Sequence, residues 1–419
     1  MRRALKRLGA MFLAAACCAA SPLAHAAGEG RAYCAALGRA VDAAAPGSGP
    51  VFVASYRPGP SEAAVPQALR SSAFSYDNAL AAIALISCGD ATRARRIADA
   101  FVFATSHDRT FDDGRIRNAY RAGAATPAPV RLPGWWDAGA NRWDEDAYQD
   151  GASTGNVAWV ALALLNAHGA TDDARYLTTA ARLLAWIDAQ TPDAHTPDAP
   201  GQPGFSGGVS GFDERQTRWS WKSTEHNIDV AAAASWAHRL TGDPAEQRMA
   251  ERAKAFVASR FRPDRKFFLI GSKPDGSDAE ADQLSLDVQV WPILGVPDAP
   301  AEWRGALGFA DAHLRKGDGM SFAGLGANRW TEGTAQAALA FRAAGDDAGA
   351  DGLLKGLPAQ ASPSGLLFAT SAGEVATGLQ VEAPGGGAFE YFHRPHLGAT
   401  AWAALAANGW NPFTGKKVG

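Results

Sequence analysis

The sequence predicts an all-α fold class, an (α/α)6 toroid in which six helical hairpins form a ring and short β-hairpin insertions lie in the rim loops. One observation behind this prediction is that alanine-rich apolar segments alternate with amphipathic ones along the chain. The other is that the joins are alike. A glycine stands where the first segment stops, and an acidic residue or proline opens the next, as in SCGDATRARR and LTGDPAEQRM. Such joins are typical of a repeat of helical hairpins.

The first 26 residues have the pattern of a signal peptide. A basic start is followed by an apolar run over 8–20 and an A-x-A cleavage site at 24–26. The run is shorter than the roughly 20 residues that span a bilayer, and no later segment is long and apolar enough, so we expect no membrane span. Cys17 and Cys18 leave lipid attachment open as an alternative. We therefore predict a signal peptide over 1–26 and a single toroidal catalytic domain over 27–419, periplasmic or secreted.

The charge balance excludes one class of partner. Cleavage would remove four of the 40 Lys and Arg residues and no acid, which leaves 36 bases against 43 acids and a net charge of −7. Nucleic-acid binding depends on clustered Lys and Arg. We therefore expect no nucleic-acid partner, and we expect the protein to act as a monomer.

Six helical pairs follow one another around the predicted ring. The first member of each pair is apolar nearly all round, which predicts a buried inner helix, and the second carries its charges on one side, which predicts an outer helix. The pairs are 77–87 with 91–106, 154–168 with 172–189, 225–240 with 244–261, 284–294 with 299–314, 332–344 with 346–357, and 396–408 with 30–45. Short β-like runs, KFFLIG and GLLFAT, stand between pairs.

Two cysteines remain after the predicted cleavage, Cys34 and Cys88. In an oxidising compartment a surviving pair is more often bonded than used for metal binding. We predict a disulfide that joins the N-terminal closing helix to the end of the first inner helix.

The N-terminal ends of the inner helices carry the candidate catalytic residues. Because helix directions alternate around the ring, all six inner helices begin on the same face, and five of the six beginnings carry Asp, Glu or His. A local alternative stays open, since Ser223, Thr224 or Thr331 could cap a helix with an acid in its first turn. The catalytic candidates are Glu225, Glu332, Asp77 and Asp150.

Aromatic and polar residues gather at the same helix ends and in two long loops, 107–150 and 191–222. Long loops of this kind tend to be functional, and flat rings presented to solvent suit the apolar faces of sugars. Some of the tryptophans could instead anchor loops, and the acidic run 144–146 could be a solvated or calcium-binding loop. The predicted substrate-binding residues are Tyr76, Asn78, Trp135, Trp136, Asp144, Trp219, Trp221, His226, Arg329, Trp330 and His396.

The motifs of other enzyme classes do not occur. The sequence has no HExxH or HxH spacing, no P-loop, no GxSxG elbow and no dinucleotide fingerprint. We expect no catalytic metal and no cofactor.

Four motifs resemble those of a known group of enzymes. Nearly the whole mature chain resembles the six-hairpin glycosidase superfamily. The resemblance rests on the six hairpins and on the runs YDNAL, STEHNID, WTEGTAQ and PHLGATAW, the last of which is followed by NPF. This resemblance implies an (α/α)6 enzyme that acts on carbohydrate. The superfamily contains hydrolases, phosphorylases, epimerases and lyases, so the fold alone does not specify the reaction.

Paired carboxyl groups favour hydrolysis. One protonated carboxyl assists the leaving oxygen and one ionised carboxyl activates water or attacks carbon, and Glu225 and Glu332 are the preferred pair. The first alternative is a polysaccharide lyase. The residues that could act on a uronate are Tyr76, Asn78, His226, Arg329 and His396. The second is a non-catalytic glycan-binding or assembly protein. The acid-rich rim favours neutral or basic sugars.

Overall fold

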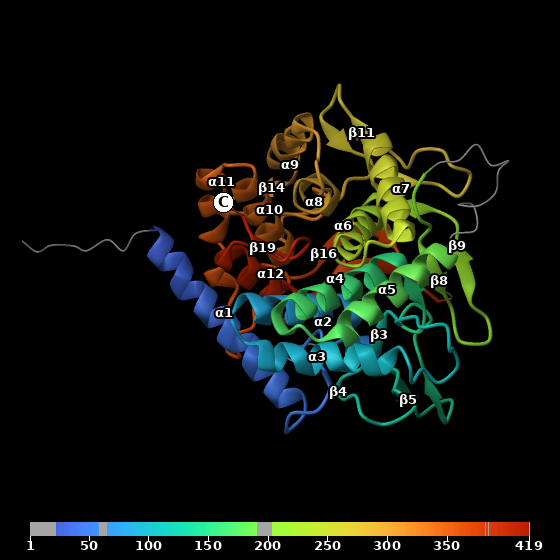
Figure 1. The fold of residues 1–419 in the computed structure, drawn as a ribbon. Coiled ribbons are helices and arrows are strands. Elements are labelled where there is room, and N and C mark those ends of the chain that lie inside the picture. The colour runs from blue at the N-terminus through green and yellow to red at the C-terminus, as the bar shows by residue number, and fades with distance from the viewer. Residues whose placement is uncertain (1–21, 58–64, 191–202, 382, 384, 419) are drawn as a thin grey trace, which may run out of the picture.

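The computed structural model describes residues 22–57, 65–190, 203–381, 383 and 385–418. Within this part of the chain there are twelve α-helices joined by loops that carry small β-ladders (Figure 1). The helices are α1 (Pro22–Ala44), α2 (Ser75–Ser87), α3 (Ala91–Ala104), α4 (Thr154–Thr171), α5 (Ala174–Ala189), α6 (Thr224–Thr241), α7 (Pro244–Arg260), α8 (Asp287–Gly295), α9 (Gly305–Leu314), α10 (Thr331–Ala343), α11 (Asp347–Leu354) and α12 (Leu397–Asn408). Most of the predicted signal peptide, 1–21, lies outside the described residues, and α1 begins within the remainder.

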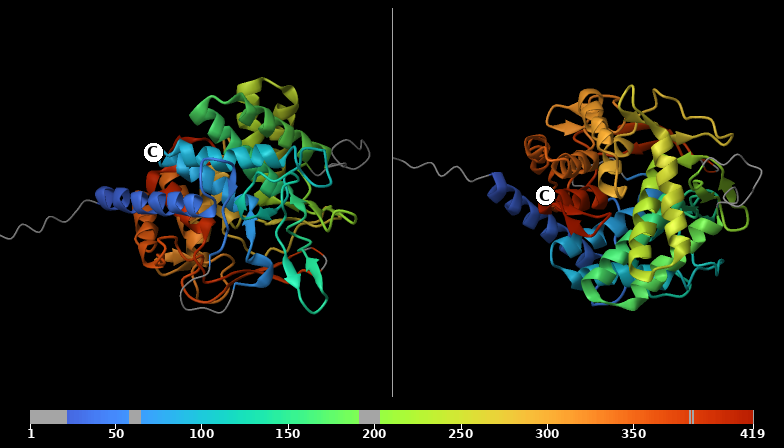
Figure 2. Two further views of the ribbon diagram at one scale, coloured as in Figure 1. Left: turned by 90° about the horizontal axis from the view of Figure 1, so that it is seen from below. Right: turned by 45° about the horizontal axis from the view of Figure 1, so that its top comes forward.

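Six helices contact one another in a closed cycle. Helix α2 packs on α4, α4 on α6, α6 on α8, α8 on α10, α10 on α12, and α12 again on α2. Each also packs on an outer partner, α3, α5, α7, α9, α11 and α1 respectively. Helix α1 lies along the outside of the molecule beside α12 (Figure 2). The inner helices are buried nearly all round, because their alanines and leucines face neighbours on every side.

The predicted helix pairs all occur, with shifted boundaries. Helix α1 begins before residue 30, and α4 extends to Thr171, where Asp172 takes a left-handed backbone conformation with φ 54°. The fourth pair is the least regular, because the second helix is split into a 3-10 turn, Ala301–Arg304, followed by α9. No helix in the described part of the chain has the length and apolarity to cross a membrane.

The strands are short and antiparallel, and they form ladders of two or three. They are β1 (Val51–Phe52), β2 (Ser72–Phe74), β3 (Ala119–Arg121), β4 (Gly123–Ala124), β5 (Trp135–Asp137), β6 (Arg142–Asp144), β7 (Ala152–Ser153), β8 (Gly208–Ser210), β9 (Thr217–Trp219), β10 (Lys222–Ser223), β11 (Phe261–Arg262), β12 (Phe267–Phe268), β13 (Gly271–Ser272), β14 (Arg315–Lys316), β15 (Gly319–Met320), β16 (Val375–Gln380), β17 (Ala388–Tyr391), β18 (Trp410–Asn411) and β19 (Lys416–Lys417).

These ladders hold the beginnings of the inner helices. Strands β2, β7 and β10 each end one residue before an inner helix starts, and they pair with β3, β8 and β13. Isolated bridges do the same for Trp330, before α10, and His396, before α12. A ladder fixes the direction in which the chain enters the helix, so it also fixes where the first-turn side chains point.

Two local predictions have mixed outcomes. KFFLIG forms β12 and the start of β13, whereas GLLFAT makes only isolated bridges, from Leu367, Phe368 and Thr370. Ser223 does cap α6, because its hydroxyl accepts the His226 N–H, but no side chain caps α10.

The predicted disulfide is present between Cys34 and Cys88, with the two Cα atoms 5.8 Å apart. It joins α1 to the residue that follows α2. The closing helix is therefore linked covalently to the first inner helix.

Candidate active site

A cavity of about 340 Å³ opens where the inner helices begin. Its floor contains Trp159 from α4 and Trp291 from α8, whose ring centroids lie 5.3 Å apart. The first turns of the inner helices supply most of its polar groups, and the hairpin β16–β17 forms one wall. The predicted residues that line it are Tyr76, Asp77, Glu225, His226, Trp330, Glu332 and His396.

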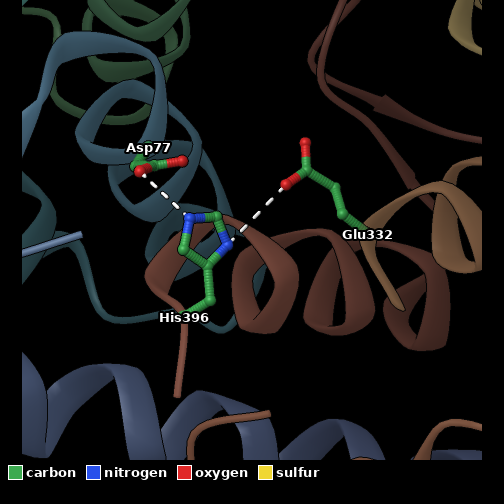
Figure 3. A group of neighbouring side chains, drawn as sticks. All are labelled: Asp77, Glu332 and His396. Atoms are coloured by element: carbon green, nitrogen blue, oxygen red, sulfur yellow. Dashed lines mark ion pairs between the residues drawn. The ribbon is translucent and has the colours of Figure 1, made fainter. Parts of the chain in front are cut away.

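At the centre, His396 lies between two acids (Figure 3). Its Nε2 is 3.4 Å from an Asp77 oxygen, and its Nδ1 is 3.9 Å from Glu332 Oε2. Nδ1 also accepts the Ala399 N–H at 3.1 Å, which caps α12. A neutral His396 therefore carries its proton on Nε2, facing Asp77. Burial lowers the pKa of His396, but Asp77 and Glu332 raise it more, so its pKa lies above the usual value.

Gly398 permits this close approach of acids. A Cβ at this position would lie 2.4 Å from Asp77 Oδ1 and 3.1 Å from Glu332 Oε2. The first distance is shorter than real Cβ atoms show. The glycine of the PHLG run is therefore required for close packing between helix α12 and the two carboxyl groups.

Tyr76 orients Glu332 through a directed chain of hydrogen bonds. The Trp402 indole N–H donates to the Tyr76 hydroxyl at 2.9 Å, and the hydroxyl donates to Glu332 Oε1 at 2.6 Å. Because the indole can only donate, the tyrosine proton must point to the carboxylate. The other oxygen, Glu332 Oε2, is buried and receives no hydrogen bond from the described residues, and it lies 3.9 Å from His396 Nδ1.

Burial and neighbouring acids raise the pKa of Glu332 and Glu225. Burial raises the pKa of Glu332 to about 7, with Asp77 and Asp287 adding to the rise and His396 and Tyr76 opposing it. Burial, Asp287 and Glu332 hold the pKa of Glu225 well above its usual value. Like charges held together in a dry site cannot all ionise. Glu225 therefore keeps its proton near neutral pH, whereas Glu332 can lose its proton there.

His226 is a neutral imidazole in the same cavity. Burial lowers its pKa to about 4, and its ring lies 5.7 Å from that of Trp221. Gly155 on α4 leaves room for it, since a Cβ there would come within 2.5 Å of the His226 ring. The imidazole can therefore donate or accept hydrogen bonds without carrying charge.

Among the described residues, one group has metal-ligand geometry. Ligand atoms of Asp77, Glu332 and His396 all lie within 4.8 Å of one another. The two imidazole nitrogens, however, face different acids, and Nδ1 already accepts a backbone N–H. One ion could therefore be bound by only one of the nitrogens. The expectation of a metal-free site stays a prediction.

Eight predicted residues do not line the cavity. Asp150 is buried beside Arg109 and Glu145, and burial together with Glu145 raises its pKa to about 8. The Asn78 side chain instead accepts a hydrogen bond from the Val53 N–H and donates one to the Val53 carbonyl oxygen. Asp144 and Arg329 form ion pairs with Arg142 and Asp318, and Trp219 stacks on Trp221 with ring centroids 5.2 Å apart. Trp135 and Trp136 lie on the hairpin β5–β6.

Asp287, Tyr56 and Tyr391 are among the residues that line the cavity and that sequence reasoning missed. Asp287 is the first residue of α8, and burial raises its pKa to about 6. Its position in LSLDV, at the start of the fourth inner helix, was the available signal. Tyr391 belongs to β17, which no sequence pattern predicted, and Tyr56 reaches the cavity through its bridge to His396.

Comparison with known proteins identifies the fold. No protein family model matches the sequence, and no curated protein matches it either. Solved structures do match. A glycosidase has a TM-score of 0.60 at 14% identity over 92% of this chain and 96% of its own. A GH76 α-mannanase from Bacteroides thetaiotaomicron has a TM-score of 0.57 at 13% identity, over 90% and 95%. A cellobiose 2-epimerase from Bacillus thermoamylovorans has a TM-score of 0.61 at 11% identity, over 91% and 98%.

These matches confirm the predicted resemblance at the level of fold. The chain has the fold of six-hairpin glycosidase superfamily enzymes, which process carbohydrate. At identities of 11% to 14% the comparison extends to the fold alone. The reaction must therefore be argued from the site.

Proposed function

We propose that this chain is a secreted or periplasmic (α/α)6 toroid enzyme, with its catalytic domain over 27–419, that hydrolyses glycosidic bonds in a poly- or oligosaccharide. The observation that supports hydrolysis is that Glu225 and Glu332 share one cavity with further acids and aromatic walls. Such a site can keep one carboxyl protonated while another ionises, which glycoside hydrolysis requires.

The two glutamates are suited to different roles. The pKa of Glu225 is held well above its usual value and its side chain lines the cavity, so it is the proton donor to the leaving oxygen. Glu332, whose pKa is about 7, is oriented by Tyr76 and serves as the base or nucleophile. Asp77, which lies beside His396, is the alternative partner for Glu225.

The lining of the cavity disfavours the lyase alternative. Among the described residues that line it, none is Lys or Arg. Uronate elimination needs a positive group near the substrate carboxylate. Arg329 pairs with Asp318 instead, and His396 already faces two acids, Asp77 and Glu332. A neutral sugar needs no such group.

The test uses Glu225→Gln and Glu332→Gln, with Glu302→Gln as a control on an exposed residue of the 3-10 turn before α9. Purified protein is incubated with a panel of neutral and acidic glycans and scored for new reducing ends. We expect each cavity variant to lose at least about 10²-fold in turnover, the low end for general acid–base catalysis, while the control keeps wild-type activity.

Other outcomes would assign another function. Full activity in both cavity variants would contradict the proposed pair. Products that absorb as unsaturated uronates would indicate a lyase, and a changed sugar configuration without new reducing ends would indicate an epimerase or isomerase. Glycan binding with no turnover in the wild type would indicate the non-catalytic alternative.

A further inference from the structure

The hairpin β5–β6 presents two tryptophans to solvent on one face. In its register Trp136 stands opposite Trp143, and cross-strand neighbours in a ladder point to the same side. The two side chains are 55% and 41% exposed, whereas Trp159, Trp291 and Trp402 are almost fully buried. The exposed pair therefore contributes little to the core, and its exposure calls for another role.

The Trp143 ring and the turn of the hairpin are held in place. The Arg121 guanidinium lies 4.7 Å from the centroid of the Trp143 ring. The Trp143 indole N–H donates to Glu145 Oε1 at 3.3 Å. In the turn between the strands, Asp137 accepts two backbone N–H groups at 2.8 and 3.1 Å. A surface ordered in this way loses little conformational freedom when it binds a ligand.

The hairpin that carries Trp136 and Trp143 is only a few residues from a residue that lines the cavity. Asp146 lines the cavity and follows Trp143 by three residues, so their Cα atoms are at most about 11 Å apart. Glu145, between them, is bonded to Arg109 at 2.7 and 2.6 Å. Figure 1 shows β5 at the lower edge of the molecule. The hairpin thus extends outward from the rim.

We propose that Trp136 and Trp143 form an outer binding site for a neutral glycan chain that continues beyond the cavity. Indole faces match the C–H faces of pyranose rings, and two indoles side by side on one face of the hairpin can contact successive sugars of one chain. The nearby acids disfavour a polyanion. This inference rests on the proposed function and specifies its substrate as a polysaccharide longer than the cavity holds.

The test measures binding apart from turnover. Trp136→Ala and Trp143→Ala are made in the Glu332→Gln background, and migration is followed in native gels that contain soluble α-mannan or soluble β-glucan. The matched control is Phe212→Ala, an aromatic residue with 42% exposure that lies between β8 and β9. We expect Trp136→Ala to weaken retardation by one polysaccharide at least about 10-fold, the scale of one lost ring contact. The control should leave retardation unchanged.

Three results would overturn the proposal. The first is that the tryptophan variants and the control are retarded equally. The second is that neither polysaccharide retards the parent protein. The third is that light scattering shows a dimer that Trp136→Ala abolishes. The last would assign the face to self-association. A wild-type protein that binds polysaccharide through these rings but cleaves no glycan would refute the hydrolase and leave the outer site standing.

Discussion

Replacing Gly398 by alanine should impair catalysis while leaving the fold intact. The added Cβ would lie 2.4 Å from Asp77 Oδ1 and 3.1 Å from Glu332 Oε2. Ordinary carbon contacts are about 3.5 Å, so Asp77 must move by about 1 Å. A displacement of this size at a reacting group can lower the rate about 10²-fold, equivalent to about 2.7 kcal/mol in activation free energy. The expected loss is in kcat.

The effect on stability should be small because two terms oppose each other. Alanine is favoured over glycine in a helix by about 1 kcal/mol, whereas overpacking a buried site costs about 1–3 kcal/mol. The assay compares kcat on the preferred glycan with Tm from circular dichroism. Gly308→Ala is the control, because that helical glycine of α9 has no atom within 4 Å of an added Cβ. An unchanged kcat in Gly398→Ala would refute the argument that this packing positions the carboxyls.

Two further predictions concern Tyr76 and the disulfide. Tyr76→Phe removes a donor that stabilises ionised Glu332, so the pKa of Glu332 should rise above about 7. The base must be ionised to act, so the acid limb of the kcat/KM profile should shift to higher pH, and an unshifted limb would argue against this role. Replacing Cys34 and Cys88 by serine opens a loop spanning a sequence separation of 54 residues. The free energy of unfolding, measured in urea, should fall by about 2–4 kcal/mol, and an unchanged value would contradict a stabilising disulfide.

The sequence by itself determined the order of the hairpins and which helices are buried. Helix ends are set by local chemistry, such as the glycine at Gly242 and the capping aspartate Asp243, so the joins could be predicted without any distant contact. A helix that is apolar on every side must be buried on every side, which distinguishes α4 from α5. Once the inner helices begin on one face, Asp77, Glu225 and Glu332 are expected at one cavity, and all three line it.

Only the tertiary structure decided which of several similar acids face the cavity. Asp150 and Asp287 both stand at the start of inner-helix segments, but Asp150 turns toward Arg109 while Asp287 faces the cavity. The chain between Asp150 and α4 is held by a ladder only two residues long, in which Ala152 lies opposite Val209. A strand this short has no periodic signature in the sequence, and its partner is 57 residues away by residue number. The hairpin β16–β17 also had no signal in the sequence. Its place in the cavity wall, and with it that of Tyr391, is set by long-range packing.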